Sequence, residues 1–328
     1  MISLKILRNE TEMCKRLIAS KQGEVDLDHV LSLDKKLRQL KTISNEMRAE
    51  RNSASETIGK LKKAGEDASD SIKKTRELGD ELKNIEKELH TVSKDLESYL
   101  YNLPNLPHES VPEGSDENFN VEIRSHGSKP EFNFEPKSHL DLGEALGLFD
   151  FKKGAKLSGS GFPLYMGKGA TLERYLINAM IEHHIQEFSF KEVFPPVLMK
   201  KESMITTGQL PKFEEDMYHT EVDNLYLAPT AEVPVTNIHR NEIISEDELP
   251  IYYVAYSPCF RRESGSYGKD TRGLLRVHQF NKVELVKFTT PEKSYEELES
   301  LTNQAESILR KLGLHYRVVE LCTGDLSF

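Results

Sequence analysis

Apolar residues recur every three or four positions through two long stretches near the start of the chain. The first series runs Leu33, Leu37, Leu40, Ser44, Met47, Arg51, Ala54, Ile58 and Leu61, with Ser44 and Arg51 as breaks. The second series runs Thr75, Leu78, Leu82, Ile85, Leu89, Val92, Leu96 and Tyr99. Alternating spacings of three and four are the heptad pattern of a coiled coil.

Between the two series lies AGEDASD, a short polar sequence suited to a tight connection, and the stretch contains no proline. The pattern therefore predicts an antiparallel helical hairpin over residues 30–101. At 1.5 Å rise per residue each arm would be roughly 45–50 Å long. Residues 1–26 are expected to form a short helix and a connector that pack against the hairpin that follows.

Prolines end the second helix, because proline cannot continue a helical hydrogen-bond pattern. They lie in YNLPNLPHESVPEGSDEN, whose polar end predicts a linker over residues 104–118. This linker would separate an N-terminal domain, residues 1–103, from a second domain, residues 119–328.

The second domain alternates helical and strand patterns. A helical stripe followed by a strand ending at Pro195-Pro196 is predicted within residues 161–198, and a later amphipathic helix closed by Gly313 precedes a strand. The stripe consists of Leu172, Tyr175, Leu176, Ala179, Met180 and Ile185. A further short strand is expected at Leu225–Leu227, and it would lead into the loop Pro229-Thr230-Ala231-Glu232.

The stretch from Tyr256 to Lys287 predicts two strands joined by a polar loop. Alternation places Arg261 and Glu263 on one side and Arg262 on the other. On the return strand, one face carries Arg276, His278, Phe280, Lys282 and Glu284, and the other carries Val277, Val283 and Leu285. A solvated sheet face would explain the carboxylates but not a phenylalanine among them or four arginines within sixteen residues.

Such a face suits a nucleoside triphosphate beside a small zwitterion. Guanidinium groups match phosphate and carboxylate oxygens, and a phenyl ring can stack on a base. The carboxylate of Glu284 can hold an ammonium or hydroxyl group.

Composition narrows the remaining function classes. The 328 residues include 54 Asp and Glu against 44 Lys and Arg, giving a formal charge of −10, so any contact with RNA must be local. Three cysteines without zinc-site spacing indicate a reducing compartment, and the N-terminus lacks a signal peptide, so the cytoplasm is expected. Adjacent His183 and His184 diverge on a helix, which predicts surface histidines rather than metal ligands; no metal site is identified.

The FRRE strand, loop and return strand resemble motif 2 of class II aminoacyl-tRNA synthetases. The run TRGLLRVHQFNKVE, together with TGQLPKF, the Thr230-Ala231-Glu232 loop and NLPN, is similar to seryl-tRNA synthetases over nearly every residue present. The resemblance implies an α+β chain. An N-terminal antiparallel coiled-coil hairpin would precede a class II catalytic domain, built on a mainly antiparallel β-sheet with flanking helices. Motifs 1 and 2 are present and motif 3 is absent, so we expect a C-terminally truncated chain that is inactive alone.

The implied reaction has two steps. Serine and ATP give seryl-adenylate, and the seryl group then passes to tRNA(Ser); whether tRNA(Sec) is also served stays open. The resemblance also implies Mg²⁺, a homodimer through motif 1, and an arm that reaches the tRNA. From the sequence alone, dimerisation or spacing would be the favoured role for the arm.

The resemblance assigns roles residue by residue. Arg261 would bridge the serine carboxylate and the α-phosphate, and Glu263 would meet the adenine or ribose. For L-serine it implies Thr230, Ala231, Glu232, Arg261 and Glu284. For ATP it implies Arg261, Arg262, Glu263, Arg276, Val277 and Phe280, with Arg262 expected to point away from the nucleotide. For tRNA it suggests Lys60, Lys62, Lys63, Lys73, Lys74 and Arg272.

Two alternatives remain beside the ligase. One is a synthetase-like paralogue that charges a carrier protein, against which the intact arm argues. The other is a catalytically silent binding or scaffold protein built from the arm and the dimer face.

Overall fold

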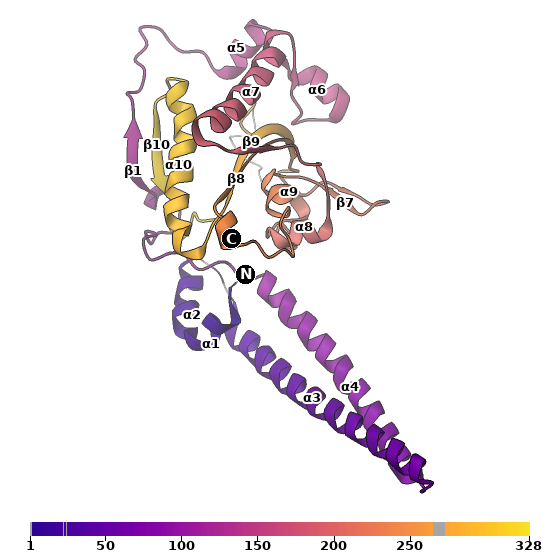
Figure 1. Ribbon diagram of the computed structural model, residues 1–328. Helices are drawn as coiled ribbons and strands as arrows, with labels where there is room; N and C mark the ends of the chain where they lie inside the picture. The colour runs from indigo at the N-terminus through magenta and orange to yellow at the C-terminus, as the bar shows by residue number, and fades with distance from the viewer. Residues whose placement is uncertain (1, 22, 24, 265–272) are drawn as a thin grey trace. The chain divides into compact units, whose positions relative to one another are not determined.

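The computed structural model describes residues 2–21, 23, 25–264 and 273–328 (Figure 1). The chain divides into two compact units. The first comprises residues 1–123 with 318–328, and the second comprises residues 124–317. Among the described residues, no helix is both long and apolar enough to cross a membrane.

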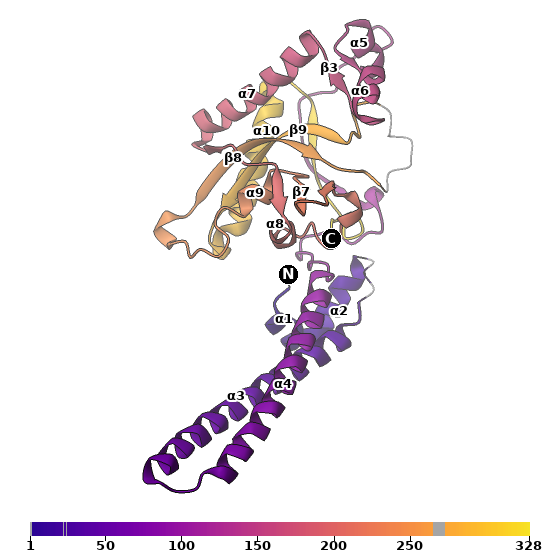
Figure 2. The same ribbon diagram turned by 90° about the vertical axis from the view of Figure 1, so that its right-hand side faces the viewer.

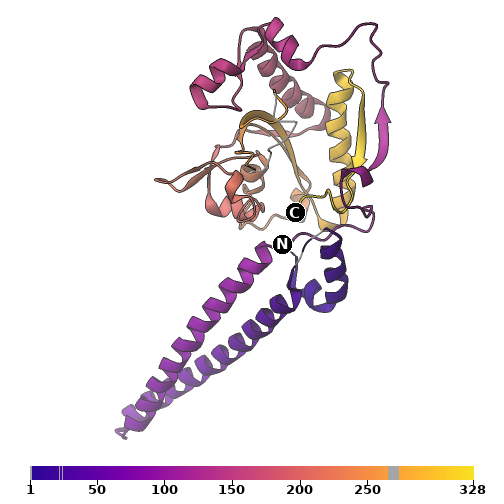
Figure 3. The same ribbon diagram turned by 180° about the vertical axis from the view of Figure 1, so that it is seen from behind.

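The first unit contains the predicted helical hairpin. Its helices are α1 (Leu4–Asn9), α2 (Thr11–Ser20), α3 (Leu27–Ala64) and α4 (Ser69–Tyr101). Helices α3 and α4 lie side by side as an antiparallel pair (Figures 1 and 3). The Asp26 side chain caps the start of α3, and Gly65, with φ of 75°, ends it in the left-handed conformation that glycine adopts without strain.

Most of the predicted interface positions lie between the two helices, and Leu37, Leu40 and Leu96 are buried. The prediction is wrong at the base of α4, where Leu100 is buried and Tyr99 is 45% exposed. Tyr99 instead contacts the edge of the His29 ring, with centroids 4.8 Å apart. The exception arises because α1 and α2 add a second packing partner here, and the core shifts by one residue to meet it.

The segment predicted as a linker makes backbone hydrogen bonds within the first unit. The Thr323 and Gly324 backbone N–H groups donate to the carbonyls of Pro112 and Gly114, over 2.9 and 2.8 Å. The Cys322 thiol beside them is fully buried.

The second unit is built around a three-stranded sheet in the order β4–β8–β9. Strand β8 (Ile251–Phe260) pairs antiparallel with β9 (Gln279–Phe288) and parallel with β4 (Lys191–Val193). Helices α7 (Lys168–Phe188) and α10 (Ser294–Lys311) pack on one face. The short helix α9 (Glu232–Thr236) packs on the other (Figure 2).

Shorter elements complete the description. They are β1 (Val121–His126), α5 (His139–Ala145), β2 (Phe149–Asp150), α6 (Phe151–Ser158), β3 (Leu164–Tyr165), β5 (Leu198–Lys200), α8 (Lys201–Thr206), β6 (His219–Thr220), β7 (Leu225–Leu227) and β10 (Tyr316–Glu320). The 3₁₀ helices are η1 (Glu117–Phe119), η2 (Glu214–Asp216), η3 (Glu246–Glu248) and η5 (Pro291–Lys293). The strand predicted at Leu225–Leu227 is confirmed as β7, the middle strand of the sheet β5–β7–β6.

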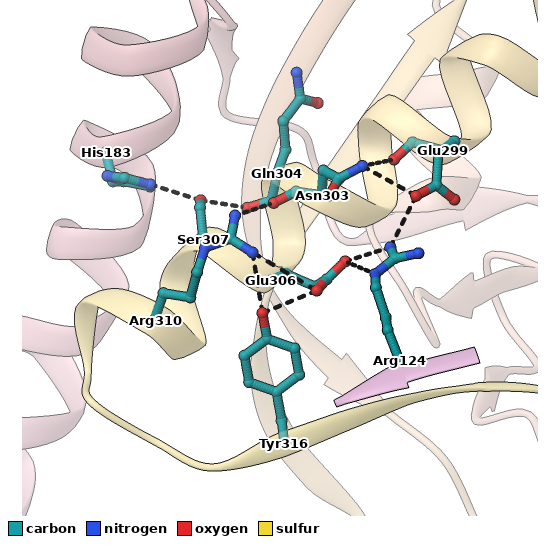
Figure 4. Close-up of polar contacts among 9 residues, drawn as sticks. All are labelled: Arg124, His183, Glu299, Asn303, Gln304, Glu306, Ser307, Arg310 and Tyr316. Atoms are coloured by element: carbon teal, nitrogen blue, oxygen red, sulfur yellow. Dashed lines mark hydrogen bonds and ion pairs between the residues drawn. The ribbon is translucent and has the colours of Figure 1, made fainter. Parts of the chain in front are cut away.

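A buried carboxylate on α10 fixes this helix to its neighbours in the second unit (Figure 4). Glu306 accepts hydrogen bonds from Arg124 Nε at 3.1 Å and from the Tyr316 hydroxyl at 2.8 Å. Arg124 also pairs with Glu299 at 2.9 Å. The bond from Arg124 and then that from Tyr316 hold the pKa of Glu306 below its usual value.

The prediction of surface histidines on α7 is wrong, because both His183 and His184 are buried. His183 Nε2 lies 2.7 Å from the Ser307 hydroxyl of α10 (Figure 4). His183 thus joins α7 to α10. No cluster of metal-ligating residues occurs in the described part of the chain. Two residues of the predicted apolar stripe, Leu172 and Tyr175, are exposed. Ile181, which was not part of the stripe, is the residue of α7 that is buried against the sheet.

Candidate active site

One face of the β8–β9 pair carries small residues on β8 opposite large ones on β9. The register pairs are Ala255 with Glu284, Ser257 with Lys282 and Cys259 with Phe280. We call Ala255, Ser257 and Cys259 the small-residue strip; all three are buried. Because the strip fills little space, the longer β9 side chains have room above it. The predicted alternation along β9 is confirmed, since Val283 and Leu285 pack on the opposite face.

The nucleotide side of the face contains a pocket of about 530 Å³. It is lined by Arg261, Glu263, Leu274, Leu275, Arg276, Val277 and Phe280. The guanidinium carbon of Arg261 lies 5.3 Å from the centre of the Phe280 ring, within cation–π range. The pocket therefore presents a flat apolar ring beside a permanent positive charge.

The strand predicted to continue through Glu263 ends three residues earlier. Strand β8 ends at Phe260, and Glu263 has a φ of 51°, so the chain turns there. The turn brings Glu263 Oε2 within 3.0 Å of Arg276 Nη1. Arg262 is not among the lining residues, and its backbone N–H donates to the Asp216 carbonyl at 2.9 Å. This position agrees with the expectation that its side chain points away from the pocket.

A second polar cluster joins β9 to the loop before α9. The Thr230 hydroxyl donates to Glu284 Oε2 over 2.6 Å. The Lys282 ammonium donates to the Thr230 hydroxyl over 2.7 Å and forms an ion pair with Glu284 Oε2 at 2.7 Å. The backbone N–H of Glu232 also donates to the Thr230 hydroxyl, over 3.2 Å. Strand alternation predicted that Lys282 lies on this face, but no role was predicted for it. Its position two residues before Glu284, on the same face, could have indicated that it contacts this carboxylate.

Glu232 completes this cluster. Burial first, and then the neighbouring Glu284 carboxylate, raise the pKa of the Glu232 carboxyl above its usual value. The positive charges of Lys282 and Arg261 act in the opposite direction. A cationic ligand placed here would favour the ionised form of Glu232 further.

Arg261 connects the pocket to the polar cluster. Its Nε donates to the carbonyl oxygen of Pro229, one residue before Thr230, over 3.3 Å. The structure thus brings together, along one sheet face, Arg261 and Phe280 on the nucleotide side and Thr230, Glu232 and Glu284 on the other. Ala231 is buried against the sheet, and Val277 lines the pocket.

His278 has a structural role that the sequence pattern did not predict. Its ring stacks on Phe162, with centroids 5.3 Å apart, and its Nδ1 lies 2.9 Å from the Tyr218 hydroxyl. A side chain at Gly161 would meet the His278 ring, and Gly161 has a φ of 80°, so glycine is required there.

The residues suggested for tRNA fall into two groups. Lys60, Lys62, Lys63, Lys73 and Lys74 are all exposed near the tip of the α3–α4 arm. Arg272 lies outside the described residues, as does residue range 265–271 of the neighbouring loop.

Comparison with known proteins links both units to one family. The description "Seryl-tRNA synthetase N-terminal domain" matches residues 1–107, and "tRNA synthetase class II core domain (G, H, P, S and T)" matches residues 212–328. Serine–tRNA ligases of Thermodesulfovibrio yellowstonii and Geobacillus kaustophilus are 53% and 51% identical to the whole chain, which covers 78% of each.

Solved structures agree. Seryl-tRNA synthetase from Pyrococcus horikoshii, complexed with ATP, is 36% identical, with a TM-score of 0.89 over the whole chain and 78% of that protein. Cytoplasmic serine–tRNA ligase from Naegleria fowleri, in complex with AMP, is 26% identical, with a TM-score of 0.83 over the whole chain and 79% of that protein.

Proposed function

The chain belongs to the seryl-tRNA synthetase family, and we propose how its site performs the serine–tRNA ligase reaction. In this reaction the serine carboxylate attacks the α-phosphorus of ATP and releases pyrophosphate. A hydroxyl of the terminal adenosine of tRNA(Ser) then accepts the seryl group. We leave tRNA(Sec) as a second acceptor to be tested.

The assignment of the site rests on the position of Arg261. Its guanidinium lies beside Phe280 on one side and bonds the loop that leads to Thr230 on the other. It can therefore contact the serine carboxylate and the α-phosphate at once, at the point where the new bond forms. Positioning and charge stabilisation of this kind supply much of the acceleration in such transfers.

The other roles follow from the two halves of the face. Phe280 would stack on adenine, while Arg276 and Glu263, paired with each other in the pocket, would meet the phosphates and the adenine or ribose. Val277 would contribute backbone contacts to the nucleotide. On the other side, Glu232 and Glu284 would receive the ammonium and hydroxyl groups of serine. ATP brings Mg²⁺ with it, because triphosphates are bound as the magnesium complex.

Three further features belong to this proposal. The arm of α3 and α4 would bind tRNA with the exposed lysines near its tip, and Arg272 would face the acceptor end. The exposed apolar residues of α7, with Phe194 just after β4, would form a homodimer contact. The cytoplasm is the proposed location, because the substrate is tRNA and the buried thiols are unpaired.

The test is selective binding of an aminoacyl-adenylate. In calorimetry, the seryl sulfamate analogue of seryl-adenylate should bind at least about 10-fold more tightly than the alanyl analogue. Serine-dependent ATP–pyrophosphate exchange is measured beside it. The preference is expected because the alanyl analogue would leave buried polar groups unpaired.

The variant Glu284→Ala should lower the affinity for the seryl analogue about 100-fold, and Glu292→Ala, an exposed carboxylate on η5, should not change it. Near-normal binding by Glu284→Ala would remove this residue from the serine site. Equal affinity of the wild type for seryl and alanyl analogues would refute the proposed function.

A further inference from the structure

The hydrogen-bonding capacity of the Thr230 hydroxyl is fully used in the absence of substrate. A hydroxyl has one proton to donate and two lone pairs. Thr230 gives its proton to Glu284 Oε2, and it accepts from the Lys282 ammonium and from the Glu232 backbone N–H. These three contacts hold the Thr230 hydroxyl in one orientation before any substrate binds.

The two oxygens of Glu284 are in different situations. Oε2 accepts a hydrogen bond from the Thr230 hydroxyl at 2.6 Å and forms an ion pair with the Lys282 ammonium at 2.7 Å. Within residues 2–21, 23, 25–264 and 273–328, Oε1 has no hydrogen-bond partner. The cluster therefore holds one oxygen in place and leaves the other available.

Lys282 is held at this position by the strand itself. It lies two residues before Glu284 on the same face of β9, and its register partner on β8 is Ser257 of the small-residue strip. Because that partner is small and buried, the stem of Lys282 has space to extend along the face toward Thr230. An incoming ammonium would have to break a hydrogen bond to Thr230 and an ion pair with Glu284, each of 2.7 Å, to displace it.

We propose that Lys282 is a positioning residue for the amino-acid pocket. Its ammonium fixes Thr230 and one oxygen of Glu284, so that the pocket offers serine the second oxygen of Glu284 at a set place. The inference rests on the proposed function and adds to it: Lys282, which contacts Thr230 and Glu284, sets the positions from which these two residues receive serine. Lys282 also balances the negative charge of the two carboxylates while the pocket is empty.

The test uses Lys282→Met, which keeps an unbranched side chain of similar length, and Lys282→Ala. Both should bind the seryl sulfamate analogue roughly 10- to 100-fold more weakly, as expected for losing hydrogen bonds to a charged group. Their affinity for AMP and their thermal unfolding temperature should match the wild type, because the nucleotide pocket does not contain Lys282. Thr230→Val should cause a similar loss, and the double variant should lose less than the sum of the two.

Chemical rescue separates positioning from general packing. Addition of n-propylammonium, which replaces the atoms missing in Lys282→Ala, should restore part of the affinity for the seryl analogue in that variant and none in Lys282→Met. Unchanged or tighter binding by Lys282→Met, or competition between n-propylammonium and the seryl analogue, would overturn the inference, since the ammonium would then occupy the place of serine. A wild-type chain without preference for the seryl analogue would instead refute the proposed function.

Discussion

At the scale of single residues, His184 shows how burial sets what a side chain can do. Its ring lies 5.9 Å from that of Phe188 and 5.7 Å from that of Phe190, centre to centre, and no partner for its Nδ1 is found among the described residues. Burial, and then the charge of His183, lower its pKa from 6.5 to about 4. The folded chain therefore keeps this histidine neutral where the unfolded chain protonates it.

The sign of the pH dependence follows from this difference. Between pH 6.5 and 4 the unfolded state binds more protons, so the free energy of unfolding falls as the pH is lowered. His184 should account for a loss of about 3 kcal/mol over this range, at 1.36 kcal/mol per pKa unit. We predict that His184→Leu reduces the pH dependence of urea unfolding between pH 6.5 and 4 by about that amount.

The control for this prediction is His90→Leu, which changes an exposed histidine on α4. It should leave the difference between pH 6.5 and 4 in place. If His184→Leu and the wild type lose stability in parallel as the pH falls, His184 is not the group responsible.

Prediction of single residues from the sequence succeeded where a regular strand continues. Phe280, Lys282 and Glu284 lie on β9, so alternation gave their common face correctly. Strand β8 ends earlier than predicted, because a positive φ at Glu263 turns the chain after Phe260 and no glycine indicates the turn. Glu263 nevertheless lines the pocket together with Arg261, as alternation predicted. Alternation failed to reveal the engagement of Thr230, since hydrogen bonds across 52 and 54 residues leave no local pattern.

At the scale of elements, the arm is the part that the sequence predicted best. Its helices bury their apolar residues mainly against each other, so the heptad pattern carries nearly all of the information. Helix α7 shows the limit of this approach. An apolar stripe indicates a helix, but it does not tell which neighbour covers the stripe. In this single chain Tyr175 stays 69% exposed while His183 and His184 are buried.

The arm also permits a clean test of its proposed role. Deleting residues 47–60 and 73–86 removes two heptads from each helix, keeps the interface in register and shortens the arm by roughly 21 Å. We predict that this deletion lowers the affinity for tRNA(Ser) more than about 100-fold in filter binding. The affinity for the seryl sulfamate analogue should stay within twofold of the wild type.

A comparison variant separates length from charge in this experiment. Lys60→Ala with Lys73→Ala and Lys74→Ala replaces, in the full-length arm, the three proposed lysines that the deletion also removes. It should weaken tRNA binding less than the deletion does, because the length of the arm is unchanged. Normal tRNA affinity after the deletion would show that the arm is not the tRNA probe.

At the scale of the whole molecule, the second unit leaves large apolar side chains on its surface. Tyr175 on α7 and Phe194 just after β4 are 69% and 77% exposed. Exposed apolar residues gathered on one flank are typical of an interaction surface, and a two-fold contact would cover the same flank on both copies.

We predict that the chain is a homodimer in sedimentation equilibrium and that Tyr175→Glu makes it a monomer. The change places a charge in a contact that excludes water. Tyr295→Glu alters a tyrosine that is 61% exposed on α10 and should leave the dimer intact. A wild-type monomer at micromolar concentration, or a dimer that survives Tyr175→Glu, would contradict the proposal.

The small-residue strip has a consequence for how this protein can change over evolutionary time. Ala255, Ser257 and Cys259 touch no part of the proposed substrates in our assignment, yet each is the cross-strand partner of a β9 side chain and lies beside it. A larger residue at any of them would push Glu284, Lys282 or Phe280 aside and change the space on this face. Substitution at these three positions is therefore constrained by side-chain volume. For the same reason they are the places where a redesign toward a bulkier or slimmer amino acid would begin.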